Sequence, residues 1–350
     1  MHSDDPRVDE GDLAEILALS AVDLRALADG HVLLTGGTGY IGRWLLEALC
    51  YANRMLKLHL RVTVLSRNPA CFARSYPHLG GDKAVSLVEG DIRDFHYFQG
   101  EFSHAIHAAT DVIATNPPLE TFDVTVLGTR RFLDFCKDRE VADVLLLSSG
   151  AVYGRIPEHI RNVPEDFCGA PCTCQKNSAY GIGKIATEWL GAAYSADGRM
   201  RCKSARIFAQ VGPYLALDKQ FAAGNFIRDA LLGQPFEIKG DGTPRRSYMY
   251  GTDLAVWLLA ILLRGKSARA YNVGSDVAVS IAELATLVAR QADVAAPDIR
   301  VHLAPQHGAK AEYYVPDITR ARNELGLNIT VPLETALRRT IDWYRPLLIG

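Results

Sequence analysis

The sequence predicts an α/β protein with a doubly wound parallel sheet and a smaller, mostly helical C-terminal lobe. Along residues 30–210, short apolar runs alternate with amphipathic stretches of helical period, which is the pattern of βαβ crossovers. Beyond that point glycine and proline become denser and helical patterns predominate. We therefore divide the chain into an N-terminal helical extension (1–29), a sheet domain (30–210) and a lobe (211–350), some of whose segments return to the sheet.

Composition excludes several kinds of partner. The 350 residues are 48% apolar with a net charge of −2 and contain no run of Lys or Arg that would favour nucleic acid or lipid. The acidic opening lacks a secretory pattern, and no apolar stretch approaches the roughly 18 residues of a membrane-spanning helix. Seven scattered cysteines suit a reducing compartment. We expect a cytoplasmic protein that binds neither nucleic acid nor membrane.

The elements follow from these patterns in chain order. Leu13, Ile16, Leu24 and Leu27 recur at helical spacing and predict a helix over 12–28 that lies outside the main fold. Apolar runs predict strands at 31–35, 61–66, 85–88, 104–107, 144–148 and 202–208. Helical spacing between them predicts helices at 40–53, 119–139 and 178–194, and beyond them at 220–232, 253–264, 280–291 and 333–345.

A glycine-rich loop connects the first strand to the first crossover helix. It reads Thr-Gly-Gly-Thr-Gly-Tyr-Ile-Gly over residues 35–42. Glycines at such a turn let a pyrophosphate approach closely, while the helix N-terminus offers unpaired N–H groups to it. The loop predicts a Rossmann-type site for a dinucleotide, with cofactor-binding residues Gly36, Thr38, Gly39, Tyr40 and Ile41.

Two further segments are candidates for the adenosine end of that site. The second strand ends in Ser66-Arg67 where an NAD enzyme usually carries an acid, so NADP is mildly favoured over NAD. A surface arginine is the alternative interpretation. Asp91 and Ile92 follow the third strand, and Asp91 either accepts from the adenine amino group or caps the next turn.

Three polar residues form a candidate catalytic set. Ser149 ends an apolar strand, and Tyr180 and Lys184 lie four residues apart on one helix face. A tyrosine with a pKa of about 10 exchanges protons poorly at neutral pH, and an adjacent ammonium together with a nicotinamide cation would lower it. We expect Tyr180 to be the acid and base, Lys184 its electrostatic partner and a cofactor ligand, and Ser149 a hydrogen-bond partner of the substrate oxygen.

The glycine loop and the Ser, Tyr, Lys set together resemble the extended short-chain dehydrogenase/reductases, the nucleotide-sugar epimerases and dehydratases. The resemblance covers about residues 30–345 and implies a nucleotide-diphosphate sugar as substrate and a homodimer formed through helices 119–139 and 177–197. It also implies roles for residues that spacing does not identify: the cofactor-lining Ala108 and Ala109, and the substrate-binding Thr110, Asn225 and Arg246. Solvated loop charge is the alternative for Arg246, and helix capping for Asn225.

The residues after the catalytic serine bear on the reaction. In the family that this sequence resembles, 4,6-dehydratases carry Asp-Glu directly after the catalytic Ser or Thr, and decarboxylases carry a Glu at this place. This chain has Gly150-Ala151 instead. Without ionisable groups at these positions, 4-epimerisation through a transient 4-keto sugar is favoured. The alternative is NADPH-dependent reduction of a 4-keto-6-deoxyhexose nucleotide. Dehydration is less favoured, and a non-catalytic NADP-sensing protein least of all.

Two groups of metal-binding residue types remain. Cys168, Cys172 and Cys174 crowd one loop, but their spacing matches no zinc knuckle, so we expect incidental thiols and no metal. His104 and His107 alternate on a buried strand and are expected to be structural, with a position facing the cofactor as the alternative.

Overall fold

The computed structural model describes residues 6–110, 117–304 and 311–349. The helices are α1 (Glu10–Arg25), α2 (Tyr40–Leu56), α3 (Pro69–Ser75), α4 (Pro77–Gly80), α5 (Pro118–Asp138), α6 (Ala179–Tyr194), α7 (Ala222–Leu231), α8 (Gly251–Arg264), α9 (Ile281–Gln291), α10 (Thr319–Leu325) and α11 (Leu333–Ile349). The strands are β1 (His31–Thr35), β2 (Arg61–Ser66), β3 (Val85–Glu89), β4 (His104–His107), β5 (Asp143–Ser149), β6 (Arg201–Ile207), β7 (Gln210–Val211), β8 (Phe236–Ile238), β9 (Arg245–Arg246), β10 (Met249–Tyr250), β11 (Arg269–Val273), β12 (Val279–Ser280), β13 (Ile299–Val301) and β14 (Tyr313–Tyr314).

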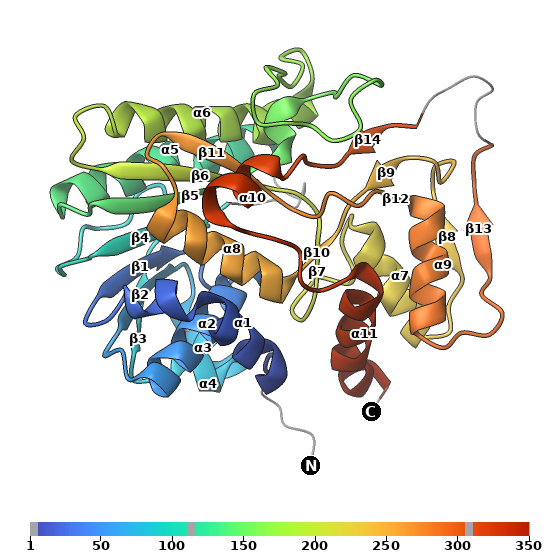
Figure 1. The fold of residues 1–350 in the computed structure, drawn as a ribbon, viewed down its shortest axis with the longest axis horizontal. Coiled ribbons are helices and arrows are strands. Elements are labelled where there is room, and N and C mark those ends of the chain that lie inside the picture. Colours follow the sequence, from blue (N-terminus) through green and yellow to red (C-terminus); the bar gives the residue numbers. More distant parts are fainter. Residues whose placement is uncertain (1–5, 111–116, 305–310, 350) are drawn as a thin grey trace.

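A seven-stranded parallel sheet in the order β11-β6-β5-β4-β1-β2-β3 forms the centre of the larger part of the molecule (Figure 1). The predicted doubly wound α/β fold is confirmed. The chain moves outward from β1 in one direction through β2 and β3, and in the other through β4, β5 and β6. Ligands of such sheets bind where the strand order reverses, outside the carboxyl ends of the strands. In this chain that place lies between the ends of β1 and β4.

Helices cover both faces of this sheet. Val32 and Leu34 of β1 pack into the core shared with α1, α2 and α8, whereas Leu33 packs into the core shared with α5. The same alternation holds in β5, where Leu145 and Leu147 face the first core and neighbouring residues face the second. Because side chains of a strand alternate between faces, β1 and β5 each contribute apolar side chains to both cores. Figure 1 shows α5 and α6 on the face opposite α1, α2 and α8.

Helix α1 does not lie outside the main fold, and that expectation was wrong. Leu13, Ile16 and Leu24 are buried in the core beneath α2 and α8. Buried Asp12 accepts hydrogen bonds from the Tyr250 hydroxyl and from Arg339 at 2.7 Å. Helical spacing predicted the helix, but a half-apolar helix gives no sign of which surface will cover it.

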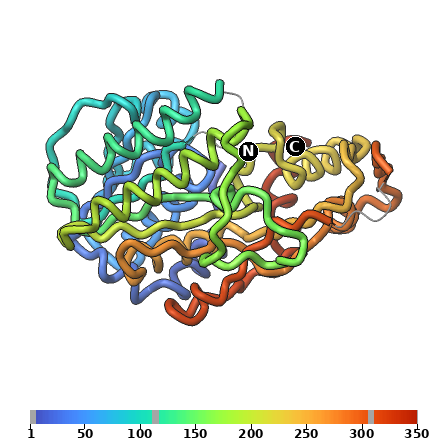
Figure 2. The backbone as a smooth tube through the Cα atoms, turned by 90° about the horizontal axis from the view of Figure 1, so that it is seen from above, coloured from blue at the N-terminus to red at the C-terminus, as the bar shows by residue number. Residues whose placement is uncertain are grey.

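The segment after residue 211 contributes to both parts of the molecule. Strand β11 pairs in parallel with β6 and completes the sheet, α8 packs beneath β5 and β6, and α10 packs on β11. Helices α7, α9 and α11 and short strands form the lobe, which Figure 2 shows extending from one side of the sheet domain. Segments therefore return to the sheet as expected, and the boundary at 210/211 stays a prediction.

Among the elements, short ones were missed. Helices α3, α4 and α10 and the two-residue strands carry too few residues to show a period. Helix α3 begins where the Asn68 side chain accepts from the Cys71 N–H at 3.0 Å, with Pro69 as its first residue. In the described ranges we find no helix with the length and apolar character needed to cross a membrane.

Candidate active site

The glycine loop is shaped for close backbone approach. Gly36 has φ +69°, and a Cβ there would lie 2.5 Å from the Ala108 carbonyl carbon at the end of β4. A Cβ on Gly42 would lie 2.3 Å from the Gly36 carbonyl oxygen. Helix α2 then begins at Tyr40 behind Gly39, with no side chain capping its N–H groups. The loop therefore leaves helix N-terminal donors for an anionic ligand.

A cavity of about 170 Å³ opens beside this loop, at the place where the strand order reverses. It is lined by most of the predicted cofactor-binding residues: Gly36, Thr38, Gly39, Ser66, Arg67, Asp91, Ile92, Ala108 and Ala109. Tyr40 and Ile41 do not line it. The Tyr40 hydroxyl donates to the Val211 carbonyl at 2.9 Å, and Ile41 packs against the core.

Ser66, Arg67 and Asp91 lie together at the far end of the cavity. Ser66 is buried, its hydroxyl accepts from the Asn68 N–H at 3.3 Å, and Arg67 is exposed. The Asp91 carboxylate accepts from Arg93, through the backbone N–H at 2.9 Å and the side chain at 2.8 and 3.0 Å. These hydrogen bonds hold the pKa of Asp91 below its usual range. Asp91 therefore caps the turn, as its alternative interpretation predicted, and its carboxylate stays ionised beside Arg67.

The three candidate catalytic residues are brought together at the end of β5 and the start of α6. Ser149 is buried, and its hydroxyl accepts from the Ala151 N–H at 3.1 Å. The same hydroxyl lies close enough to the Tyr180 phenol to lower the pKa of that phenol. The Lys184 ammonium lies 5.7 Å from the centroid of the Tyr180 ring and donates to the Leu147 carbonyl at 2.6 Å. Strand and helix thus place one hydroxyl, one phenol and one ammonium near one another.

Burial dominates the ionisation of this set. It raises the pKa of Tyr180 above its usual range, and the Ser149 hydrogen bond opposes this. Burial also lowers the pKa of Lys184 to about 7, with Glu188 opposing. The lowering of the Tyr180 pKa that we expected from Lys184 is not found in the chain alone, because the ammonium bonds a carbonyl and the phenol has lost its water.

Tyr314 also lies near the candidate catalytic residue Ser149, and sequence reasoning missed it. Burial raises the pKa of Tyr314 to about 12, and the nearby Ser149 hydroxyl opposes this rise. Strand β14 pairs in parallel with β9, which sets Tyr314 opposite Arg246, whose guanidinium carbon lies 5.5 Å from the Tyr314 ring centroid. No local signal could have found this contact, because it depends on a strand pairing between distant segments.

Behind the cavity, buried His107 connects β1 to α5. The Thr129 hydroxyl donates to a carbonyl one turn earlier at 2.6 Å, so it accepts from His107 Nε2–H at 3.1 Å. Nδ1 then accepts from the Thr35 hydroxyl at 2.8 Å, and Thr35 accepts from the Ala109 N–H at 3.3 Å. Burial and then the charge of Lys184 lower the pKa of His107 to about 3. The structural expectation for His107 agrees with this neutral, fully bonded imidazole.

The predicted substrate-binding residues are less closely grouped. Thr110 lines the cavity and lies 3.3 Å from the Thr125 hydroxyl. Arg246 pairs with Glu312 at 3.1 Å and is not an isolated solvated charge. Asn225 lies inside the first turns of α7, whose N-cap is Phe221, so the capping alternative for Asn225 is wrong. The role of Asn225 in substrate binding stays a prediction.

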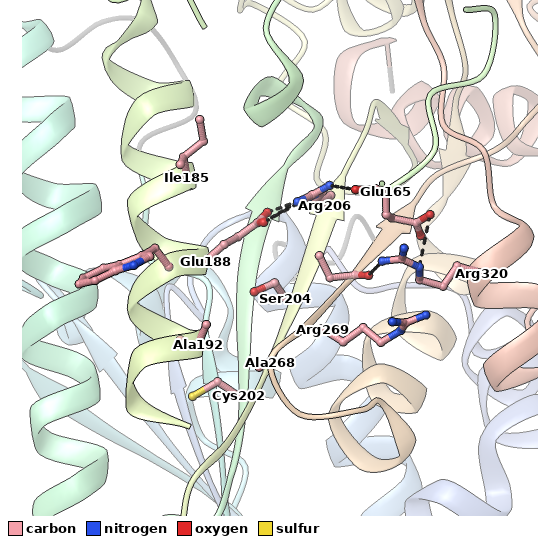
Figure 3. Close-up of a pocket in the computed structure, with 13 residues that line it drawn as sticks. Glu165, Ile185, Glu188, Ala192, Cys202, Ser204, Arg206, Ala268, Arg269 and Arg320 are labelled. Carbon is pink, nitrogen blue, oxygen red and sulfur yellow. Dashed lines mark hydrogen bonds and ion pairs between the residues drawn. The ribbon is translucent and has the colours of Figure 1, made fainter. Parts of the chain in front are cut away.

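Two other features lie apart from the cavity. A larger hollow of about 410 Å³ opens between α6, β6 and α10, and Glu188 and Arg206 lie on its wall (Figure 3). Cys168, Cys172 and Cys174 are exposed, and no group of three metal-ligating side chains gathers in residues 6–110, 117–304 and 311–349.

The donor set fits a dinucleotide. A Cβ at Gly36 or Gly42 would fill the space in which the glycine loop could hold a pyrophosphate. The start of α2 offers N–H groups that the Gly39 N-cap does not bond through a side chain. Ser66, Arg67 and ionised Asp91 line the part of the cavity into which a ribose and base would extend. Gly36, Thr38 and Gly39 would hold the pyrophosphate, and Ala108 and Ala109 would line the path towards Tyr180.

Comparisons with known proteins agree with this geometry. The model of the NAD dependent epimerase/dehydratase family matches residues 32–274. UDP-glucuronic acid decarboxylase 1 of Danio rerio is 28% identical over 317 residues, which cover 90% of this chain and 72% of that protein. Among solved structures, MoeE5 in complex with UDP-glucose and NAD is 26% identical, with a TM-score of 0.73 and coverage of 91% of this chain and 100% of that one.

The UDP-glucose 4-epimerase of Thermotoga maritima, solved with UDP-glucose, shares the fold. Its TM-score is 0.75 at 20% identity, and the match covers 91% of this chain and 99% of that chain. The family match spans the glycine loop, the cavity and the Ser149, Tyr180 and Lys184 set. The chain therefore belongs to the NAD-dependent epimerase/dehydratase family of extended short-chain dehydrogenase/reductase enzymes.

Proposed function

We propose that this enzyme catalyses 4-epimerisation of a nucleotide-activated hexose through a transient 4-keto sugar. The observation that carries the proposal is the contact of Ser149, Tyr180 and Lys184 beside a dinucleotide cavity, with no ionisable side chain at residues 150 and 151. Abstraction and return of hydride at one carbon need one acid and base, whereas water elimination needs further proton-transfer groups.

The roles follow from position. Tyr180 takes the proton of the C4 hydroxyl as the 4-keto sugar forms, and it returns a proton to the C4 oxygen when the rotated keto sugar is reduced on its other face. Ser149 donates to the C4 oxygen, and the positive charge of Lys184 together with that of a bound nicotinamide would favour the phenolate of Tyr180. A dinucleotide held by the glycine loop would supply hydride transfer to and from C4. Arg246 and Asn225 are proposed to bind the diphosphate, and Thr110 to border the sugar.

Decarboxylation is a second candidate, supported by the similarity to UDP-glucuronic acid decarboxylase 1. Oxidation at C4 of a hexuronate creates a β-keto acid, which loses carbon dioxide from the neighbouring carbon, so the same three residues could begin this reaction. Against it stands Gly150-Ala151, where the resemblance places a glutamate in decarboxylases. The epimerase proposal therefore comes first.

One experiment separates the candidates. The protein is denatured, the released nucleotide is identified by mass spectrometry, and fresh enzyme is incubated with UDP-, dTDP- and GDP-hexoses, UDP-glucuronate and 4-keto sugars. Sugar isomerised without consumption of added cofactor supports the epimerase. Carbon dioxide released from UDP-glucuronate supports the decarboxylase. NADPH oxidised one-for-one against a 4-keto sugar supports the reductase, and no reaction with any member contradicts the proposal.

We also propose that two copies associate through α5 and α6. Leu127 on α5 and Trp189 on α6 are 53% and 67% exposed, which is high for large apolar side chains on packed helices. Sedimentation velocity of the wild type and of Trp189→Glu tests this. A dimer that the substitution dissociates is expected, and a monomeric wild type would contradict it.

A further inference from the structure

Helix α6 carries a third polar residue on the face that bears Tyr180 and Lys184. Glu188 follows Lys184 by four residues, so Tyr180, Lys184 and Glu188 occupy successive turns of one side of the helix. This face packs against the end of β5, where Leu147, Ser148 and Ser149 are consecutive.

Each of the three helix residues contacts one of the three strand residues. The Lys184 ammonium donates to the Leu147 carbonyl at 2.6 Å, and the Ser148 hydroxyl donates to Glu188. The Tyr180 phenol lies near the Ser149 hydroxyl, which lowers the pKa of the phenol. Because these contacts differ in length and polarity, a shift of the helix by one turn would break all of them. They fix the register of the catalytic helix on the catalytic strand.

Glu188 is itself held from a neighbouring strand. Arg206 of β6 donates to both of its carboxylate oxygens, Nε at 2.9 Å and Nη2 at 2.8 Å. The remaining guanidinium nitrogen donates to the Tyr153 hydroxyl and to the Glu165 carbonyl, each at 2.9 Å. Figure 3 shows Glu188 pointing from α6 across the hollow to Arg206, with Glu165 beyond. A bidentate pair of this kind restricts orientation more than a single contact does.

We propose that Glu188, oriented by Arg206, is a positioning residue for catalysis: it anchors α6 on β5 and places a negative charge one helical turn from the Lys184 ammonium. The effect of Glu188 on turnover rests on the proposed function. Its effect on the protonation of Lys184 can be measured without any reaction.

The surroundings of both groups support an electrostatic role. Lys184 faces Tyr180 and Glu188 on α6 and neutral His107 from β4. Glu188 faces Arg206 from β6 and Ser148 from β5, and Glu165, Arg269 and Arg320 line the same hollow.

Of the groups around Lys184, the Glu188 carboxylate favours the ammonium, while burial disfavours it. A merely structural Glu188 would stabilise the fold without affecting the protonation of Lys184.

The test compares Glu188→Gln with Glu324→Gln in the full chain. Glu324 of α10 resembles Glu188 in accepting a hydrogen bond from an arginine, Arg269. Its other partner is Tyr271, which lies outside α6 and β5. Lysines labelled with ¹³C at Cε are titrated by NMR, and the Lys184 signal is assigned with Lys184→Met. We expect Glu188→Gln to lower the Lys184 midpoint by about one pH unit or more. Glu324→Gln should leave it unchanged.

An unchanged Lys184 midpoint in folded Glu188→Gln would overturn the proposal. If that variant does not fold because Arg206 is left unpaired, the double variant Glu188→Gln/Arg206→Gln removes both charges, and a smaller midpoint shift in the same direction is expected because loss of the Arg206 cation partly offsets loss of the carboxylate. With an active substrate from the panel, the pH dependence of kcat should shift in the same direction while KM changes by less than about threefold. If no substrate reacts even with wild type, the proposed function fails while the Lys184 titration still decides this inference.

Discussion

The phenolic oxygen of Tyr314 lies 2.6 Å from the position that a Cβ on residue 150 would occupy. A side chain larger than that of glycine at this position, the first after Ser149, would therefore displace Tyr314. A Phe208 ring atom lies 2.8 Å from the same point. The sequence has no acid at residue 150, and the structure shows that the Tyr314 hydroxyl, which lies near Ser149, occupies the space that such a side chain would need.

Gly150→Ala should destabilise the protein and slow turnover. Overpacking at a buried position costs about 1–3 kcal/mol. Displacement of Tyr314 from Ser149 should lower kcat by about tenfold or more. Urea unfolding and steady-state kinetics measure both effects. Gly240→Ala is the matched control, since no atom of residues 6–110, 117–304 and 311–349 lies within 4 Å of its added Cβ.

Tyr314→Phe in the Gly150→Ala background should recover part of the lost stability, because it removes the nearest clashing atom. The Phe208 contact remains, so recovery should be incomplete. If Gly150→Ala is as stable and active as Gly240→Ala, the steric account is wrong.

Tyr180→Phe should abolish turnover and keep cofactor affinity. The substitution removes only the phenolic oxygen, so activity should fall below about 1% of wild type. Isothermal titration with NAD and NADP should give affinities within about threefold of wild type. Tyr194→Phe, at the other end of α6, is the control and should stay active. Activity well above the stated level would remove Tyr180 from the role of acid and base.

Arg67→Ala should weaken NADPH more than NADH. Arg67 is exposed beside buried Ser66 in the cavity, and loss of a charge-assisted hydrogen bond to a 2′-phosphate should raise the Kd for NADPH by about tenfold or more. Fluorescence titration with both cofactors measures this. Arg61→Ala, at the opposite end of β2, serves as control. Equal weakening of the two cofactors would show that Arg67 does not read the 2′-phosphate.

His107 should make the protein sensitive to acid. Its pKa is lowered to about 3 in the folded state, against about 6.5 in an unfolded chain. Between these values the unfolded chain binds a proton that the folded protein does not, so stability falls as pH drops through this window. From pH 7 to pH 4.5 this group should remove about 2 to 3 kcal/mol.

Urea unfolding of wild type and His107→Gln at both pH values checks this. The variant lacks the titrating ring, so its loss of stability over this range should be smaller by that amount. An equal loss in both proteins would show that His107 does not titrate in this way.

Several features were determined by the sequence alone. Strands at 31–35, 61–66 and 104–107 have the bounds that apolar runs predicted, and the glycine loop and the Tyr180–Lys184 spacing pointed to the dinucleotide cavity and the catalytic helix. These features are local, because period, turn chemistry and helix-face spacing are written within a few consecutive residues. The catalytic and binding roles assigned to them stay predictions.

Tertiary structure alone decided which distant residues meet. The contact of Tyr314 with Ser149, the burial of α1 beneath α8, the bonds of His107 to Thr35 and Thr129, and the hold of Arg206 on Glu188 all join separate elements. Such contacts depend on strand order, parallel register and the surface that covers each helix. The physical reason is that the spacing of residues along the chain shows on which face of a helix or strand a side chain lies. Its partner is set by packing between elements that are far apart in the chain.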